Sequence, residues 1–101
     1  MSTPHGELQR RRFPRLKCFV AVSLRAKDRD LFVMGTLSTI SLGGCGIEAG
    51  NAVEIGMTVE IALFENDTIS VIGVVVDHRL LVDKPGFGIG VEFMDHERAQ
   101  N

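Results

Sequence analysis

The N-terminal part of the chain carries a dense group of arginines: Arg10, Arg11, Arg12 and Arg15. A guanidinium group offers five N–H donors in a planar fork. This fork pairs in a bidentate way with a phosphate or with O6 and N7 of guanine, and its plane stacks on a purine. Because Arg11 and Arg15 are four positions apart, they can contact different parts of one small anionic ligand. Arg10 adds a cation for a second phosphate or guanine.

A second segment, residues 39–44, reads Thr-Ile-Ser-Leu-Gly-Gly and separates two apolar runs. The Ser41 hydroxyl both donates and accepts hydrogen bonds. Gly43 and Gly44 permit unusual backbone angles and let a ligand approach the main chain. An arginine segment folded over this turn would hold a small, planar, anionic ligand, and a nucleotide fits that description. Taken separately, the Gly-Gly pair is typical of an ordinary turn and the arginines of a solvated basic tail.

The positive charge is confined to the start of the chain. Residues 1–29 hold eight Lys or Arg and two acidic residues, whereas residues 30–101 hold three Lys or Arg and eleven acidic residues. A protein that grips a long nucleic-acid backbone usually spreads its basic residues over a wider face. This distribution, together with the lack of Trp and Tyr, favours a compact anion. A small nucleic-acid-binding barrel is the less favoured alternative.

The other reactive side chains form no catalytic or metal-binding pattern. No His and Asp are spaced to activate Ser41 as a nucleophile. The three histidines are scattered, and the two cysteines lack a metal-ligand spacing. We interpret Cys18 and Cys45 as reduced thiols that pack like small apolar groups. Asp77 and His78 are adjacent on an expected strand and face opposite ways, so at least one belongs to the ordinary surface. We expect no enzymatic activity, no metal and no cofactor.

Length and composition predict one domain. The chain has 101 residues, of which 45% are hydrophobic, enough for a single core and too many for disorder over most of the length. No apolar run is long enough to span a membrane and no signal peptide is apparent, so we expect a cytoplasmic protein. We expect residues 1–16 to form a flexible basic tail, residues 17–95 a β-barrel, and residues 96–101 a C-terminal tail with a short helical turn.

Period-2 patterns of apolar residues, and a β-branched run with both faces apolar at residues 69–79, predict six strands. They lie at residues 18–24, 31–40, 45–48, 58–64, 69–79 and 87–93. Residues 65–68 and 83–86 have the composition of hairpin turns. Six strands with short connections predict a small six-stranded antiparallel β-barrel. Gly86, Gly88 and Gly90 share one face of the last strand, which is typical of tight curvature or of a close backbone approach.

The two segments, read on this all-β pattern, resemble the motifs of the PilZ domain, the bacterial receptor module for cyclic di-GMP. Arg11-x-x-x-Arg15 is similar to the family's R-x-x-x-R element, directly before the first strand. Thr39-x-Ser41-x-x-Gly44 is similar to its (D/N)-x-S-x-x-G element, at the end of the second. Residues 88–93, Gly-Ile-Gly-Val-Glu-Phe, resemble the closing G-x-x-F strand. The resemblance covers residues 9–95, and the order and separation of the motifs make it more specific than either motif alone.

The resemblance implies that the Ser-Gly element reads a guanine edge while the arginine segment folds over the ligand. Family members hold one ligand or an intercalated pair, and Arg10 favours the pair. The family usually has Asp or Asn at the position of Thr39. A carboxylate accepts two hydrogen bonds from guanine N1–H and the 2-amino group, whereas a single hydroxyl does not. We therefore expect weaker binding than is usual in the family. The implied ligand-binding residues are Arg10, Arg11, Arg15, Thr39, Ser41, Gly43 and Gly44.

The resulting hypothesis is a stand-alone cyclic di-GMP receptor that binds without chemistry. Binding is expected to change the conformation of the N-terminal arginine segment and so to signal to a separate, unidentified effector protein. Motility, biofilm and exopolysaccharide control are the processes that the resemblance implies. The alternative is a PilZ-like adaptor that acts through protein contacts and binds nucleotide weakly or not at all, which Thr39 favours.

Overall fold

The computed structural model describes residues 14–26, 28–63 and 70–94. Several predictions from the sequence lie outside these residues and stay predictions. They concern the tail with Arg10 and Arg11, the hairpin turn at residues 65–68, the helical turn after residue 95 and the boundary between residues 95 and 96. Within the described ranges, no helix has the length and apolar character needed to cross a membrane.

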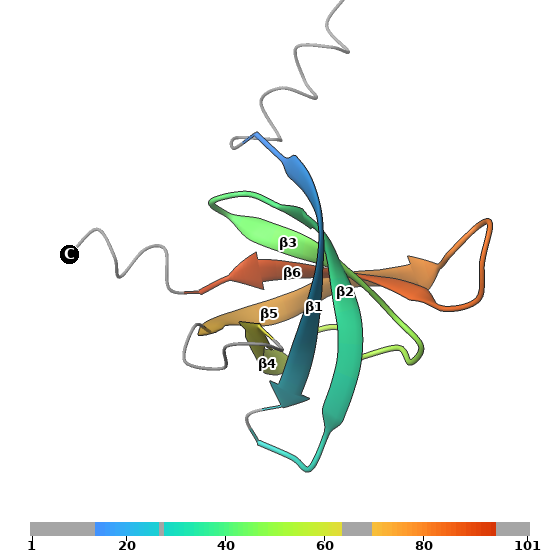
Figure 1. Cartoon of the computed structure of the whole chain (residues 1–101). Helices are drawn as coiled ribbons and strands as arrows, with labels where there is room; N and C mark the ends of the chain where they lie inside the picture. Colours follow the sequence, from blue (N-terminus) through green and yellow to red (C-terminus); the bar gives the residue numbers. More distant parts are fainter. Residues whose placement is uncertain (1–13, 27, 64–69, 95–101) are drawn as a thin grey trace, which may run out of the picture.

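Six antiparallel strands close into a barrel, as the sequence predicts (Figure 1). Neighbouring strands follow the order β1-β2-β3-β6-β5-β4, so β1 pairs with both β2 and β4. Each strand starts within one residue of its predicted position except β1, which begins two residues earlier. The strands are β1 (Leu16–Ala26), β2 (Phe32–Ile40), β3 (Gly44–Ala49), β4 (Thr58–Leu63), β5 (Ser70–Leu80) and β6 (Phe87–Phe93).

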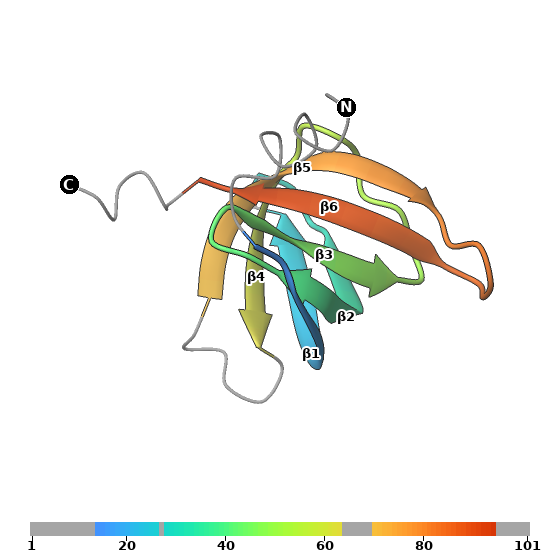
Figure 2. The same ribbon diagram turned by 90° about the horizontal axis from the view of Figure 1, so that it is seen from above.

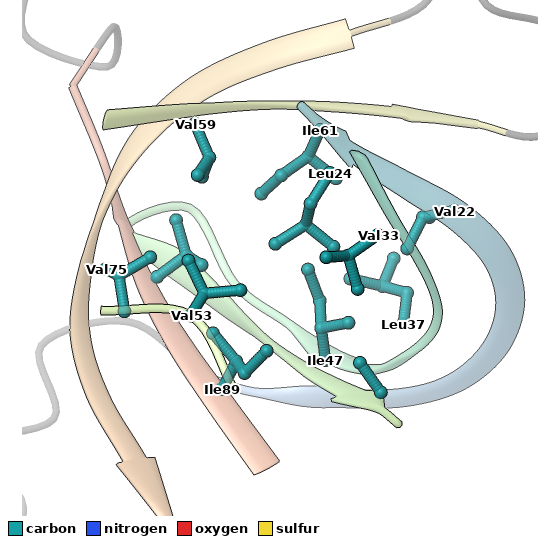
Figure 3. Packing of buried hydrophobic residues seen from close by; sticks show 12 residues of the cluster. Val22, Leu24, Val33, Leu37, Ile47, Val53, Val59, Ile61, Val75 and Ile89 are labelled. Atoms are coloured by element: carbon teal, nitrogen blue, oxygen red, sulfur yellow. The ribbon is translucent and has the colours of Figure 1, made fainter. Parts of the chain in front are cut away.

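The interior is filled by aliphatic side chains from all six strands, which Figure 3 shows converging on one another. Along β1, Val22, Leu24 and Ala26 are buried, while the residues between them are more exposed. Burial of one Val or Leu side chain stabilises a fold by about 1.5–3 kcal/mol. The alternation that predicted the strands is therefore also what encloses the core.

Among the described residues, three β-bulges interrupt the regular strand pairing. In each, one strand carries a residue more than its neighbour, and the extra residue reverses the inward and outward alternation relative to that neighbour. The bulges lie in β1 between Lys17 and Val20, in β2 between Leu37 and Thr39, and in β5 between Val75 and Asp77.

The β5–β6 hairpin extends beyond the barrel (Figures 1 and 2). β4 pairs with β5 only as far as Val74, whereas β6 follows β5 to Leu80. The predicted turn at residues 83–86 closes this hairpin. Gly86 has a φ of 121°, and a Cβ there would lie 2.8 Å from the Ala49 carbonyl oxygen, so both its conformation and its surroundings require glycine.

Candidate ligand-binding site

The β2–β3 turn (residues 41–43) is held by hydrogen bonds of Ser41. Its amide donates to the Gly44 carbonyl at 2.8 Å, and its hydroxyl donates to the same oxygen at 3.3 Å. The hydroxyl also accepts a hydrogen bond from the Gly43 amide at 3.2 Å. The Phe93 amide donates to the Gly43 carbonyl at 2.9 Å and ties the turn to β6. Ser41 therefore shapes the turn, in addition to the ligand contact predicted for it.

Glycine is required at position 44 by strand packing, and not by the unusual backbone angle that the sequence predicted. Among the described residues, positive φ angles occur at Gly56 and Gly86, and not at Gly43 or Gly44. A Cβ on Gly44 would overlap the backbone carbonyl oxygen of Val91 on β6. The close approach of β3 to β6, rather than an unusual backbone angle, excludes a side chain here.

Arg15 lies at the same end of the barrel as this turn. β1 begins at Leu16, which is paired with Ile40, the last residue of β2. The residues next to that pair are Arg15 on one strand and Ser41 on the other. Arg15 is exposed, so its guanidinium is available to a ligand at the turn. Arg10 and Arg11 precede the described residues.

One row of in-register residues crosses the outer face of the barrel beside the turn. Its members come from β1, β2, β3, β6 and β5 in that order: Lys17, Thr39, Gly46, Gly90 and Asp77. The row faces outward, because Ile47 and Ile89, which flank its two glycines, point into the core. Gly46 and Gly90, paired with each other, form a side-chain-free area that we call the glycine platform.

Polar side chains border the platform on two sides. A Cβ on Gly46 would lie 2.9 Å from Thr39 Oγ1 and 3.6 Å from Ser38 Oγ. A Cβ on Gly90 would lie 3.3 Å from Asp77 Cβ. The β2 edge therefore carries two hydroxyls and the β5 edge a carboxylate. A planar ring can lie on the backbone between them.

The bulges produce these edges. Leu37 faces the core, so strict alternation along β2 would also turn Thr39 inward. The extra residue at the β2 bulge instead pairs Thr39 with the outward-facing Gly46. The bulge in β5 has the same effect, because it pairs Asp77 with the outward-facing Gly90 although Val75 is buried. Bulges are frequent next to functional sites, where they re-aim side chains.

Comparison with known proteins identifies the family. The family model described as PilZ domain matches residues 9–101. The chain belongs to the PilZ family. No curated protein matches it by sequence.

Solved structures of PilZ proteins share the fold. The PilZ domain with c-di-GMP of YcgR from Escherichia coli has a TM-score of 0.68 and 17% identity, over 91% of this chain and 87% of that chain. MotI/DgrA, an inhibitor of motility from Bacillus subtilis, has a TM-score of 0.67 and 15% identity, over 89% and 47% of the two chains. The MrkH–c-di-GMP complex of K. pneumonia has a TM-score of 0.69 and 18% identity, over 91% and 50%. The chain thus spans about half the length of the MotI/DgrA and MrkH chains.

Within the PilZ barrel, sequence analysis missed four residues around the platform: Ser38, Gly46, Gly90 and Asp77. The sequence indicated tight curvature or a close backbone approach at Gly90, but Gly90 was not among the predicted ligand-binding residues. Gly46 follows the Ser-Gly element by two residues, and that proximity is a signal that could have drawn attention to it. Asp77 is distant in sequence and was noted only because it adjoins His78. The two do face apart: Asp77 lies outside, whereas Nδ1 of His78 donates to the Val53 carbonyl at 2.9 Å.

A separate hollow of about 390 Å³ lies at the other end of β3. Met34, Thr36 and Leu81 line part of it, together with an ion pair of 2.9 Å between Lys84 Nζ and Glu48 Oε1. That pairing raises the pKa of Lys84. Within the described part of the chain, no group of His, Cys, Asp and Glu has the arrangement of a metal site.

Cys18 and Cys45 are free thiols at the edge of the core, in agreement with the sequence. Burial, and to a lesser extent the neighbouring Cys18, raises the pKa of the Cys45 thiol from 9.0 to about 12. Between these two pH values the unfolded chain loses this proton and the folded chain keeps it. The contribution of Cys45 to stability is therefore fully present below about pH 9 and is lost as the pH rises toward 12.

We expect the urea midpoint of the wild type to fall more between pH 8 and pH 11 than that of Cys45→Ala, because the variant lacks this titration. Urea midpoints that fall equally in the two proteins over this pH range would contradict the burial of the thiol.

In the Cys18→Ser variant, iodoacetamide at pH 8 should modify Cys45 far more slowly than it modifies a free peptide thiol, because the thiolate is the reacting form.

Proposed function

We propose that this PilZ domain is a receptor that binds cyclic di-GMP and performs no chemistry on it. The observation that carries the proposal is the Leu16–Ile40 pairing, since it brings the end of the R-x-x-x-R element to the Ser-Gly turn. Membership of the PilZ family supports it, as do the YcgR and MrkH structures, both of which contain c-di-GMP. The proposed ligand-binding residues are Arg10, Arg11, Arg15, Thr39, Ser41, Gly43 and Gly44.

The chemistry of each group suggests its part in binding. The arginines pair with the two phosphates and with guanine O6 and N7. The glycine platform offers a guanine ring a surface of bare backbone, and the hydroxyls of Ser38 and Thr39 offer hydrogen bonds at one edge. In this proposal either one ligand molecule or an intercalated pair is bound, and Arg10 favours the pair.

Binding would also change the N-terminal segment. In the free protein, like charges among the arginines oppose close packing of that segment. Ligand phosphates remove this repulsion, so the segment closes over the ligand and presents a different surface to an effector protein. This proposal locates the protein in the cytoplasm. A role in motility would agree with the neighbour MotI/DgrA, an inhibitor of motility.

Thr39 favours a second candidate function, an adaptor that acts through protein contacts and binds nucleotide weakly or not at all. Thr39 offers guanine one hydroxyl where the family usually offers a carboxylate or an amide. Calorimetric titration with cyclic di-GMP, GTP and a short single-stranded RNA separates the possibilities. A preference for the cyclic dinucleotide supports the receptor. RNA binding with a steep salt dependence would indicate a nucleic-acid-binding barrel, and no binding to any of the three would leave the adaptor.

Thr39→Asp tests which edge of the platform guanine faces: the orientation that the Ser-Gly motif implies predicts that cyclic di-GMP binding tightens by about ten- to a hundredfold. The new carboxylate would accept hydrogen bonds from guanine N1–H and the 2-amino group, and a bidentate base contact contributes about 1–3 kcal/mol. Isothermal titration calorimetry of the two proteins measures the difference. Unchanged or weaker binding would show that the N1–H and 2-amino edge of guanine is turned away from β2, toward the β5 side of the platform, because one guanine cannot present these donors to both edges.

A further inference from the structure

We propose that Asp77 on β5 is the side chain that recognises guanine in this protein. This inference rests on the proposed binding of cyclic di-GMP and names a specificity residue outside both sequence motifs. It follows from the arrangement of side chains around the glycine platform.

Asp77 borders the platform directly. It is in register with Gly90, which is in register with Gly46, and all three face outward. The Asp77 Cβ lies 3.3 Å from where a Cβ of Gly90 would stand. A ring lying on Gly46 and Gly90 would therefore meet the Asp77 carboxylate at its edge, in the plane where a base presents its hydrogen-bonding groups.

The chemistry of guanine matches this edge better than the opposite one. The N1–H and 2-amino groups of guanine are adjacent donors, and a carboxylate offers two adjacent acceptors. On the β2 edge, Thr39 has a single hydroxyl, and the Ser38 hydroxyl donates to the Gly46 carbonyl at 3.1 Å. The β5 edge therefore carries the paired acceptors that the β2 edge lacks.

Arg79 orients the carboxylate. Its Nη1 donates to Asp77 Oδ2 at 2.8 Å, and both side chains are more than half exposed. An ion pair this exposed contributes little to stability. It does limit the rotation of a short side chain before the ligand arrives, which reduces the entropy cost of binding. A carboxylate has about four lone-pair sites, so a bond from Arg79 leaves sites for guanine.

Glu92 is the natural comparison. It is an exposed acid on the same outer face, two residues from Gly90 and in register with Gly44. Its side chain is longer, and it is one row away from the platform. Glu92→Ala therefore removes the same charge from the same face without removing the group proposed to read guanine.

The test compares the affinities of each variant for cyclic di-GMP and cyclic di-AMP. The two ligands carry the same phosphates, so a general change in electrostatic attraction cancels in the ratio of their affinities. Adenine lacks the N1–H and 2-amino donors. We expect the wild type to prefer cyclic di-GMP, and Asp77→Ala to lower that preference by about ten- to a hundredfold. Glu92→Ala should leave the ratio unchanged, and Arg79→Ala should lower it by less than Asp77→Ala does.

A third ligand, cyclic di-inosine monophosphate, removes only the 2-amino group. The wild type should bind it less tightly than cyclic di-GMP, whereas Asp77→Ala should distinguish the two less. Thermal melting confirms that each variant is folded.

Three results would overturn the proposal for Asp77. The first is an Asp77→Ala variant that keeps the wild-type ratio of affinities for cyclic di-GMP and cyclic di-AMP, and the second is a Glu92→Ala variant whose ratio falls as much as that of Asp77→Ala. The third is a wild type that binds the two ligands equally well. If Arg15→Ala still removes binding in these cases, the proposed function stands. Failure of the wild type to bind cyclic di-GMP at all overturns both.

Discussion

Arg15→Ala is expected to weaken cyclic di-GMP binding by roughly thirtyfold to a few thousandfold. This range corresponds to the cost of about 2–5 kcal/mol for removing one member of a charged, hydrogen-bonded pair. Arg15 is the arginine of the R-x-x-x-R element that lies within the described residues, next to Leu16 and across from the β2–β3 turn. Calorimetry on the wild type and the variant at one fixed salt concentration measures the loss.

Arg25→Ala provides the matched control. Arg25 is on the same strand but at its other end, where its guanidinium carbon lies 5.8 Å from the centroid of the Phe32 ring. The variant loses the same charge as Arg15→Ala and should keep wild-type affinity. Equal losses in both variants would mean that total positive charge, rather than a site at the turn, determines binding. That outcome would favour the nucleic-acid alternative.

Gly44→Ala is expected to lower the free energy of unfolding by about 1–3 kcal/mol, the usual cost of forcing an extra carbon into a packed region. The added methyl group would overlap the Val91 carbonyl oxygen, so β3 and β6 must separate where they pair beside the turn. For a domain of this size, each kcal/mol lowers the melting temperature by about 4–8 °C. Calorimetric melting or urea unfolding measures the change, and ligand binding should fall as the turn is displaced.

Gly50→Ala is the control for this experiment. No heavy atom lies within 4 Å of a Cβ at that position, and its φ lies outside the left-handed region. The substitution restricts the unfolded chain, so it should be neutral or stabilise the protein by up to about 1 kcal/mol. A Gly44→Ala protein that melts like the wild type and yet fails to bind would assign Gly44 to ligand approach, as the sequence had suggested, rather than to strand packing.

The strands could be predicted because they depend on a local property of the sequence, the recurrence of apolar residues at every second position, as in the buried Val22 and Leu24 of β1. Most connections join antiparallel neighbours, but β3 and β4 follow each other in the chain and do not pair. The bulges were not predicted, because one polar residue at the spacing of a core residue does not by itself reveal an extra residue in the strand. Thr39 follows Leu37 at the spacing of a core residue and yet faces outward.

The candidate site was predicted as far as it is contiguous in sequence. Arg15 and the Ser-Gly turn were each expected at a strand end, and the pairing of Leu16 with Ile40 agrees with their meeting. The positions of Arg10 and Arg11 stay predictions. The β5 edge could not be foreseen. Asp77 pairs directly with Gly90 on β6, but it comes near Gly46 and Thr39 only because β6 pairs with β3 and β3 with β2. No spacing along the chain encodes that arrangement.

Because of the bulges, substitutions and single-residue deletions have different effects on the outer face of this barrel. A substitution at Ser38 alters one side chain. Deleting that residue would remove the bulge and its hydroxyl, keep Thr39 facing outward opposite Gly46, and leave the pairs from Gly35 to Leu37 intact. Gain or loss of single residues at strand ends is therefore a route by which relatives can exchange one recognition surface for another on an unchanged interior.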